Sequence, residues 1–180
     1  MKWVVAALLA LQTGHRAAET QRGIFSVAPC LGGQFGTDDA ADFSGLTWID
    51  AAPDLKGKVA LVRWWTNDCS LCSASAPALA ELSKKAAVVA VYHPKPPRDV
   101  AADDVRAFAK KIGMPGSLAI DRDWKVLNRW MDPKKRQFTS LTFLLDKKGK
   151  VRHVHRGGEI EPKDAVELGQ QIDALLAEKE

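Results

Sequence analysis

Two short apolar runs constrain the fold of this chain more than any other feature. Residues 59–65, "VALVRWW", and residues 86–92, "AAVVAVY", are each of strand length and almost continuously apolar. Runs of this kind are typical of strands that are buried on both faces of a sheet. Between them, residues 72–85 have a helical composition that Pro77 interrupts and should kink. A strand, a helix and a second strand in this order predict parallel pairing with a right-handed crossover.

The rest of the chain extends this unit into a larger sheet. A lysine- and glycine-containing turn joins two strand-like segments late in the sequence and predicts an antiparallel hairpin. The expected fold class is therefore α/β, with a mixed central β-sheet flanked by helices. The remaining segments are, in order, an amphipathic helix (99–113), a short strand (117–121), a short helix (123–131), the hairpin (138–156) and a final helix (161–180).

The N-terminus has a different character. Met1 and Lys2 precede the apolar stretch "WVVAALLAL", and the sequence then turns polar. This pattern predicts a signal peptide over residues 1–18, whereas a buried helix or a short membrane tether is the alternative. Residues 19–45 are expected to form an extended segment with a short strand near 24–27. Residues 46–180 are expected to form the folded domain.

Composition excludes several classes of protein. A net charge of +4 over 180 residues is mild, which argues against a dedicated nucleic-acid binder. No apolar run reaches the roughly 18–20 residues that cross a bilayer, so no stable membrane span is expected after signal cleavage. The chain has 3 cysteines, too few for a disulfide scaffold, and Cys30 is interpreted as a free thiol on a loop.

The other two cysteines form the candidate site. Cys69 and Cys72 are spaced as C-x-x-C between a buried strand and a helix. They could be a redox couple, a metal clip or a structural disulfide, and the strand-to-helix position favours the redox couple. Free N–H groups and the helix dipole favour a thiolate at Cys69, while Cys72 is held one turn later. Cys69 is then the attacking thiol and Cys72 the resolving one.

The motifs around the pair resemble those of a known family. The carrying stretches are "DLKGKVALVRWWTNDCSLC", Pro77 after the second cysteine, and "TSLTFLLDKKGKV". Together they resemble the thioredoxin-like superfamily, and within it the TlpA/ResA-type thiol–disulfide oxidoreductases. The resemblance implies a monomer of thioredoxin-like fold over residues 46–178 that exchanges disulfides with protein substrates and a redox partner protein. It implies no cofactor and no metal, and an exported, periplasmic or membrane-tethered location.

Three features depart from the family pattern. Asp68 stands where relatives have an aromatic or small residue, and it is interpreted as a helix N-cap, a tuner of the thiol, or both. Arg63 and Ser75 occupy the places where relatives carry a buried acid that assists the resolving cysteine. Ser140 replaces the family's cis-proline, which adds a hydroxyl but loses a fixed backbone shape.

The topology also predicts which residues share the site. Parallel strands end on one edge of the sheet, so Cys69 and His93 should lie there together with the start of the hairpin at Ser140. His93 is interpreted as a loop histidine rather than a catalytic base. Arg63 is expected to pack its stem and keep its charge at the surface, and the alternative is a cation that lowers the pKa of a cysteine. Trp65 is expected to lie in the core or line a groove, and Lys134, Lys135 and Arg136 could offset the charge of Asp68.

Two other functions fit parts of the pattern. Thr66 and Cys69 supply the T-x-x-C of peroxiredoxins, although Val62 stands where that pattern has proline. A thioredoxin-like copper chaperone would use both cysteines, with His93 as a third ligand, because soft thiolates suit Cu(I). The cysteines of such chaperones are typically more widely spaced.

Overall fold

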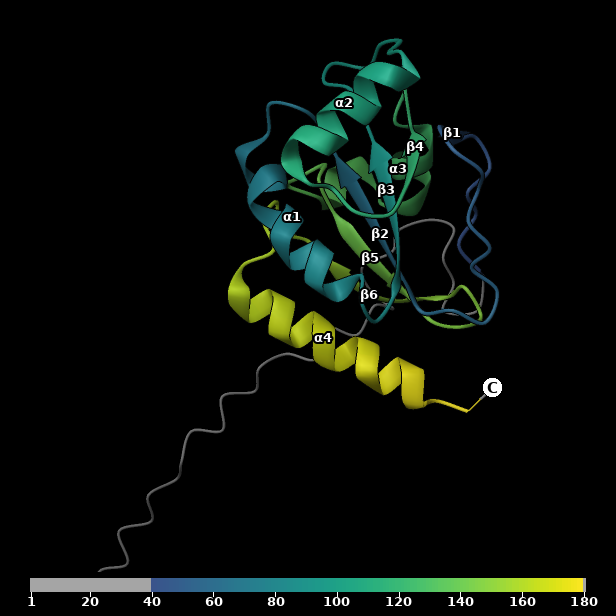
Figure 1. Cartoon of the computed structure of the whole chain (residues 1–180). Helices are drawn as coiled ribbons and strands as arrows, with labels where there is room; N and C mark the ends of the chain where they lie inside the picture. Colours follow the sequence, from purple (N-terminus) through teal and green to yellow (C-terminus); the bar gives the residue numbers. More distant parts are fainter. Residues whose placement is uncertain (1–39, 180) are drawn as a thin grey trace, which may run out of the picture.

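A six-stranded mixed sheet forms the centre of the protein, with the strand order β1-β4-β3-β2-β5-β6. A computed structural model of the chain describes residues 40–179 (Figure 1). The central strand β2 (Ala60–Trp65) pairs in parallel with β3 (Ala87–Tyr92) and antiparallel with β5 (Thr142–Leu145). The outer strands are β1 (Thr47–Trp48), β4 (Ser117–Ile120) and β6 (Val151–His155).

Helices cover both faces of this sheet. One face carries α1 (Ser70–Leu82), α2 (Ala102–Ile112) and α4 (Pro162–Ala177), whose apolar residues form one core cluster with the sheet. The other face carries α3 (Lys125–Trp130) and the segment that leads to β2, which together form a second cluster. A short 3-10 helix, η1 (Pro133–Lys135), follows α3. The expected fold class, α/β with a mixed sheet flanked by helices, is confirmed.

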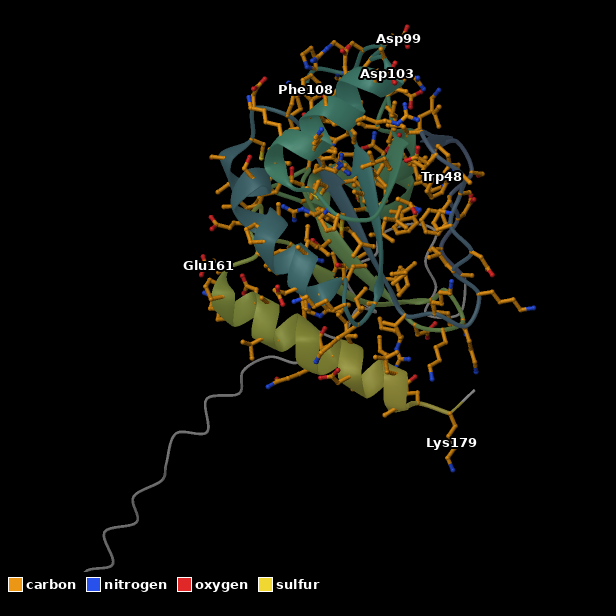
Figure 2. All side chains as sticks on the ribbon, viewed as in Figure 1. Trp48, Asp99, Asp103, Phe108, Glu161 and Lys179 are labelled. Atoms are coloured by element: carbon orange, nitrogen blue, oxygen red, sulfur yellow. The ribbon has the colours of Figure 1, made fainter. Side chains whose placement is uncertain are left out.

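The central strands explain the apolar runs in the sequence. All of β2 and nearly all of β3 are buried, because β2 has a strand on each side and helices above and below. Successive side chains point to opposite faces, so Leu61 and Trp65 join the α1 cluster while Val62 and Trp64 join the α3 cluster. Phe108 of α2, labelled in Figure 2, stacks on Tyr92 of β3.

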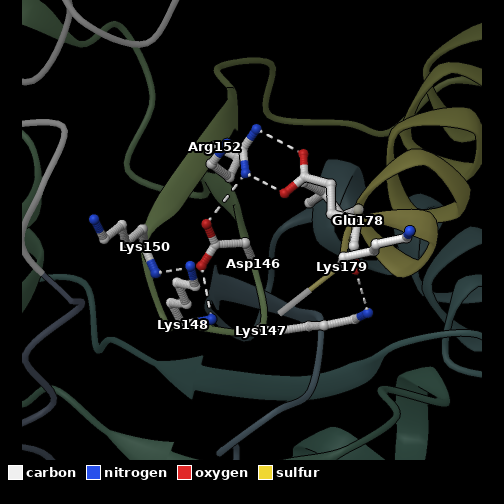
Figure 3. Close-up of a pocket in the computed structure, with 8 residues that line it drawn as sticks. Asp146, Lys147, Lys148, Lys150, Arg152, Glu178 and Lys179 are labelled. Carbon is white, nitrogen blue, oxygen red and sulfur yellow. Dashed lines mark hydrogen bonds and ion pairs between the residues drawn. The ribbon is translucent and has the colours of Figure 1, made fainter.

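Polar contacts fix the end of α4 against the hairpin. Arg152 on β6 forms ion pairs with Glu178 beyond the helix and with Asp146 at the end of β5 (Figure 3). Lys147 donates from Nζ to the carbonyl oxygens of Leu176 and Glu178, which satisfies carbonyls at the helix C-terminus. This cluster of charges is therefore explained by the anchoring of the helix.

Several expectations about element boundaries can be compared with the structure. The strand β1 was not expected, and α1 begins at Ser70, earlier than the composition suggested. The C-cap of α2 is Gly113, which has the left-handed conformation and is also the last residue of the predicted range 99–113. The signal peptide at 1–18, the strand near 24–27, Cys30 and almost all of the extended segment 19–45 lie outside the described residues. Within residues 40–179, no helix combines the length and apolarity that crossing a membrane requires.

Candidate functional site

The two cysteines lie at the edge of the sheet where β2 and β3 end. β2 ends at Trp65, and three residues lead from it to Cys69, which is the N-cap of α1. Cys69 has the extended backbone expected of an N-cap, and its sulfur accepts a hydrogen bond from the Cys72 backbone N–H at 3.3 Å. The Cys69 sulfur therefore partners an N–H of the first helical turn, which would otherwise have no intrahelical acceptor.

Asp68 is not the helix cap, and that interpretation is corrected by the structure. It precedes the cap with φ of 53°, in the left-handed region that Asp tolerates better than most residues. Its exposed side chain accepts a hydrogen bond from Asn67 Nδ2 at 2.8 Å. The turn from β2 into α1 therefore uses the backbone of Asp68, while Cys69 takes the capping role.

Cys72 is buried one turn into α1 and contacts Cys69 directly. The two sulfur atoms are 2.7 Å apart, and the Cys72 thiol also donates to Ser140 Oγ at 3.2 Å. Burial and the hydrogen bond to Cys69 raise the pKa of Cys72, whereas Ser140 and the positive charge of Arg63 act to lower it. The site thus contains one partly exposed sulfur and one buried sulfur, close enough to form a disulfide after small rotations.

Arg63 lies beneath the pair, and its expected surface position is wrong. Its side chain is fully buried on the α1 face of β2, because the segments after β6 and before β5 cover it. Nη1 donates to the Ser140 carbonyl oxygen and to Thr142 Oγ1, both at 3.1 Å. Nη2 donates to the Gly158 carbonyl oxygen and more weakly to Ser75 Oγ at 3.4 Å.

His93 follows β3 and is buried rather than exposed on its loop. Its Nε2 is 2.9 Å from Thr139 Oγ1, and its ring packs edge-on against Trp124. Burial, with further contributions from nearby cations that include Lys95, lowers the pKa of His93 to about 3. The structure places His93 next to the segment that carries Ser140, as the topology predicted, and the ring is neutral near pH 7.

The remaining candidate residues differ in their relation to the pair. Trp65 is buried in the same core cluster as Cys72, whereas Pro77 lies exposed within α1. Arg136 donates to the Met131 carbonyl oxygen and to Asn128 Oδ1 at the end of α3. Lys134 and Lys135 are exposed on η1. The hydrogen bond of the Asp68 carboxylate goes to its neighbour Asn67, so the structure does not pair it with these three cations.

Sequence reasoning missed two members of the site. Thr142 and the Gly158 carbonyl oxygen both bind Arg63, but they lie 79 and 95 residues from it along the chain. A Cβ at Gly158 would come within 2.7 Å of Leu71 Cδ1, so a larger residue here would require the Leu71 side chain to move, and "GG" at 157–158 was the available signal. Within residues 40–179, no three His, Cys, Asp or Glu side chains form a group that could hold a metal ion.

Comparisons with known proteins agree with this geometry. The family model described as Redoxin matches residues 44–172. The fold is similar to a candidate protein disulfide isomerase from Bacteroides thetaiotaomicron, with 22% identity, a TM-score of 0.63, and coverage of 83% of this chain and 95% of that chain. It is also similar to a candidate thiol:disulfide interchange protein DsbE from Chlorobium tepidum (26% identity, TM-score 0.55, coverage 68% and 83%).

A third similar structure is a secreted disulfide oxidoreductase of Mycobacterium tuberculosis that is homologous to E. coli DsbE. It has 19% identity and a TM-score of 0.54, and the match covers 71% of this chain and 92% of that chain. The comparison with curated proteins found no significant match. The expected membership of the thioredoxin-like superfamily is confirmed by the family match and by these structures.

Proposed function

Since the chain belongs to the Redoxin family, we propose that it is a thiol–disulfide oxidoreductase that exchanges disulfides with protein substrates. The observation that carries the proposal is the pairing of a partly exposed Cys69 with a buried Cys72, whose sulfur atoms are 2.7 Å apart. One sulfur can meet a partner protein while the other is reached only from within the site. This asymmetry is what a two-step exchange through a mixed disulfide requires.

The exchange proceeds through both cysteines in turn. In the reducing direction, the Cys69 thiolate attacks one sulfur of a substrate disulfide, a Cys69–substrate bond forms, and the other substrate sulfur leaves as a thiolate. Cys72 then loses its proton and attacks Cys69, which releases the substrate thiol and leaves the Cys69–Cys72 disulfide. The oxidising direction is the reverse of these steps. The position of Cys69 at the start of α1 supports its role as the cysteine that meets the substrate in both directions.

The neighbouring side chains have supporting roles in this proposal. Ser140 hydrogen-bonds the resolving thiol, and Arg63 holds the Ser140 carbonyl in place. His93 is a neutral positioning residue for Thr139, which precedes Ser140. Trp65 belongs to the core cluster that contains Cys72, and Asp68 shapes the turn before Cys69. We assign no cofactor and no metal to the reaction.

We also propose an extracytoplasmic, periplasmic setting for the protein, with residues 1–18 as its export signal. The short apolar stretch after Lys2 supports an export signal, and one similar structure is that of a secreted protein. An oxidising compartment would supply both protein disulfides and partner thiols. The partners are then a protein substrate and a redox partner protein, and the enzyme acts as a monomer.

Disulfide exchange with insulin tests this function. We expect Cys69→Ser to abolish the protein-catalysed reduction of insulin disulfides, in which dithiothreitol supplies the electrons. Cys72→Ser should accumulate mixed disulfides with the substrate, which mass spectrometry detects. Cys30→Ser is the matched control, because it removes a cysteine but leaves the C-x-x-C pair intact. Full activity in the Cys69 variant would show that the proposed mechanism is wrong.

Two assays separate this function from its alternatives. Fast peroxide consumption that exceeds the rate of an ordinary thiol would favour a peroxidase, for which Thr66 and Cys69 supply part of the pattern. Stoichiometric Cu(I) binding by the reduced protein would favour a copper chaperone. The structure gives the latter little support, because His93 already contacts Thr139 and is not grouped with the two sulfurs as a ligand set in residues 40–179.

A further inference from the structure

Arg63 is a fully buried cation whose hydrogen-bond partners are all neutral. They are two carbonyl oxygens, of Ser140 and Gly158, and two hydroxyls, of Thr142 and Ser75. In the part of the chain that the structure describes, no carboxylate forms an ion pair or hydrogen bond with this guanidinium. Its Nε also has no hydrogen-bond partner there.

A buried guanidinium of this kind needs a compensating negative charge. Transfer of an ion from water into a protein interior costs several kcal/mol unless an opposite charge offsets it. Burial lowers the pKa of Arg63, and the groups that act in the other direction are the Cys72 and Cys69 sulfurs. Arg63 and Cys72 meet at Ser140, whose carbonyl oxygen accepts from Nη1 at 3.1 Å and whose Oγ accepts from the Cys72 thiol at 3.2 Å. A thiolate on the pair is therefore the anion available to this cation.

We propose that Arg63 is the fixed counter-charge of the Cys69–Cys72 pair and makes the pair an oxidant of protein thiols. The inference rests on the proposed function and adds its direction. The reduced pair can carry a thiolate that offsets the buried charge, whereas the disulfide is neutral and leaves Arg63 uncompensated. A group that stabilises the reduced form raises the reduction potential of the couple, so the disulfide form becomes a stronger oxidant.

The oxidising cycle uses this charge at the step where Cys72 leaves. A substrate thiolate attacks Cys69 Sγ, the substrate–Cys69 bond forms, and the Cys69–Cys72 bond breaks with its electron pair on Cys72. Burial opposes a charge on this sulfur and raises the pKa of Cys72, and the Arg63 charge together with Ser140 Oγ acts against that effect. A second substrate thiolate then attacks the substrate sulfur of the mixed disulfide, and Cys69 leaves.

The net change moves two electrons and two protons from the substrate dithiol to the enzyme. The substrate gains one disulfide, and the enzyme becomes a dithiol. When one of its two thiols ionises, the negative charge of that thiolate offsets the positive charge of Arg63. A partner disulfide, of a protein or of glutathione, takes the electrons back and restores the Cys69–Cys72 bond.

The opposite direction has less support from the side chains around Cys72. In a reductase cycle the buried Cys72 thiol must lose its proton before it attacks the mixed disulfide. Its side-chain hydrogen-bond partners among residues 40–179 are Cys69 and Ser140, and neither is a carboxylate base.

The test is the equilibrium of the pair with glutathione, measured in a Cys30→Ser background so that only Cys69 and Cys72 report. Protein is equilibrated with mixtures of reduced and oxidised glutathione, quenched with acid and labelled with a maleimide of known mass. We expect Arg63→Met and Arg63→Gln to shift the equilibrium constant at least tenfold towards the disulfide. This change corresponds to a reduction potential that is lower by about 30 mV. Arg63→Lys keeps the charge and should stay within threefold of the parent.

Arg106→Met is the matched control, because it removes an exposed arginine on α2 that pairs with Asp50 and Asp103. It should leave the constant unchanged. The side chain introduced by Arg63→Gln can still donate to the carbonyl oxygens of Ser140 and Gly158, so this variant separates lost charge from lost hydrogen bonding. A purely structural role for Arg63 predicts lower unfolding temperatures for these variants without the tenfold shift, and that result overturns the inference.

A measurement on the parent protein serves if the variants do not fold. We expect equal concentrations of reduced and oxidised glutathione, at millimolar levels, to leave the pair mainly as dithiol. A pair that is mainly disulfide there overturns the assignment of an oxidant. By contrast, a pair that exchanges with no disulfide at all contradicts the proposed function itself, so the two failures are distinguishable.

Discussion

The Ser140 side chain accepts a hydrogen bond from the Cys72 thiol at 3.2 Å, although the two residues are 68 positions apart. The same serine places its carbonyl oxygen 3.1 Å from Arg63 Nη1. Among residues 40–179 the only cis peptide bond is Lys95–Pro96, so the bond before Ser140 is trans. Where the resembling family has a cis-proline beside its active site, this chain has a hydroxyl that contacts the buried sulfur.

Ser140→Ala should slow the step in which Cys72 resolves a mixed disulfide. Once Cys72 ionises, the Ser140 hydroxyl can rotate and donate to the thiolate, which lowers the pKa of Cys72, so its loss should raise that pKa and reduce the fraction of thiolate. One hydrogen bond is worth about 1 kcal/mol, which corresponds to roughly a fivefold longer lifetime of the intermediate. Acid-quench measurements of the mixed disulfide give this lifetime, and Ser83→Ala, at the far end of α1, is the control. An unchanged lifetime would leave Ser140 without a role in resolution.

Substitutions of Asp68 should depend on backbone shape more than on charge. At φ of 53°, Asn and Gly are accommodated, whereas a β-branched residue is strained. Asp68→Asn should keep the free energy of unfolding close to that of the parent, and Asp68→Val should lose about 1–2 kcal/mol. Urea denaturation measures both. Equal stability of the Val variant would contradict the left-handed turn before Cys69.

Stability should decline in acid partly through His93. Its pKa is about 3 in the folded protein and about 6.5 in an unfolded chain. As the pH falls from about 6.5, the unfolded chain binds a proton that the folded protein does not, so stability falls by up to about 1.4 kcal/mol per pH unit.

Urea unfolding of the parent and of His93→Gln between pH 7 and pH 4 isolates this effect. Burial also lowers the pKa values of His153 and His155, but both residues are present in the two proteins and their effects cancel in the difference. We expect the loss of stability in acid to be smaller in the variant. Identical pH profiles would mean that His93 is protonated in the folded protein.

Two glycines with positive φ should respond differently to alanine. A Cβ at Gly116 would lie 2.2 Å from the Val88 carbonyl oxygen, whereas a Cβ at Gly113 meets nothing within 4 Å. Gly116→Ala should therefore lower the free energy of unfolding by about 3 kcal/mol or more, because the added Cβ overpacks the site. Gly113→Ala should lower it by only about 1 kcal/mol, because the left-handed backbone alone is strained. Chemical denaturation of the two variants provides the comparison. Similar losses in both would mean that β3 can move away from Gly116.

The sequence was most informative where local pattern and burial coincide. The runs at 59–65 and 86–92 correspond closely to β2 and β3, because strands buried on both faces leave no polar positions to obscure them. The pairing of β1 with β4 was not predictable, since two residues carry no periodic signal. Propensity suggested the N-cap as one of the roles open to Asp68, but the turn geometry gives that place to Cys69.

Arg63 shows why the centre of the site could not be derived from local sequence. An arginine in an apolar strand normally extends its charge to solvent, and this rule predicted a surface position. Its actual partners at Ser140, Thr142 and Gly158 lie 77 to 95 residues away, and only the folded topology brings them over β2. The C-x-x-C motif located the site, whereas long-range contacts determine its electrostatics.

The packing of Trp65 gives the protein an optical reporter of its own chemistry. Its indole is buried in the cluster that contains Cys72 and lies edge-on to Tyr92, shielded from solvent quenchers. In the proposed cycle, formation or cleavage of the Cys69–Cys72 bond should change the electronic surroundings of this cluster. The tryptophan fluorescence of the unlabelled protein should therefore change with each turnover. In the Trp65→Phe variant, this change of fluorescence should be absent.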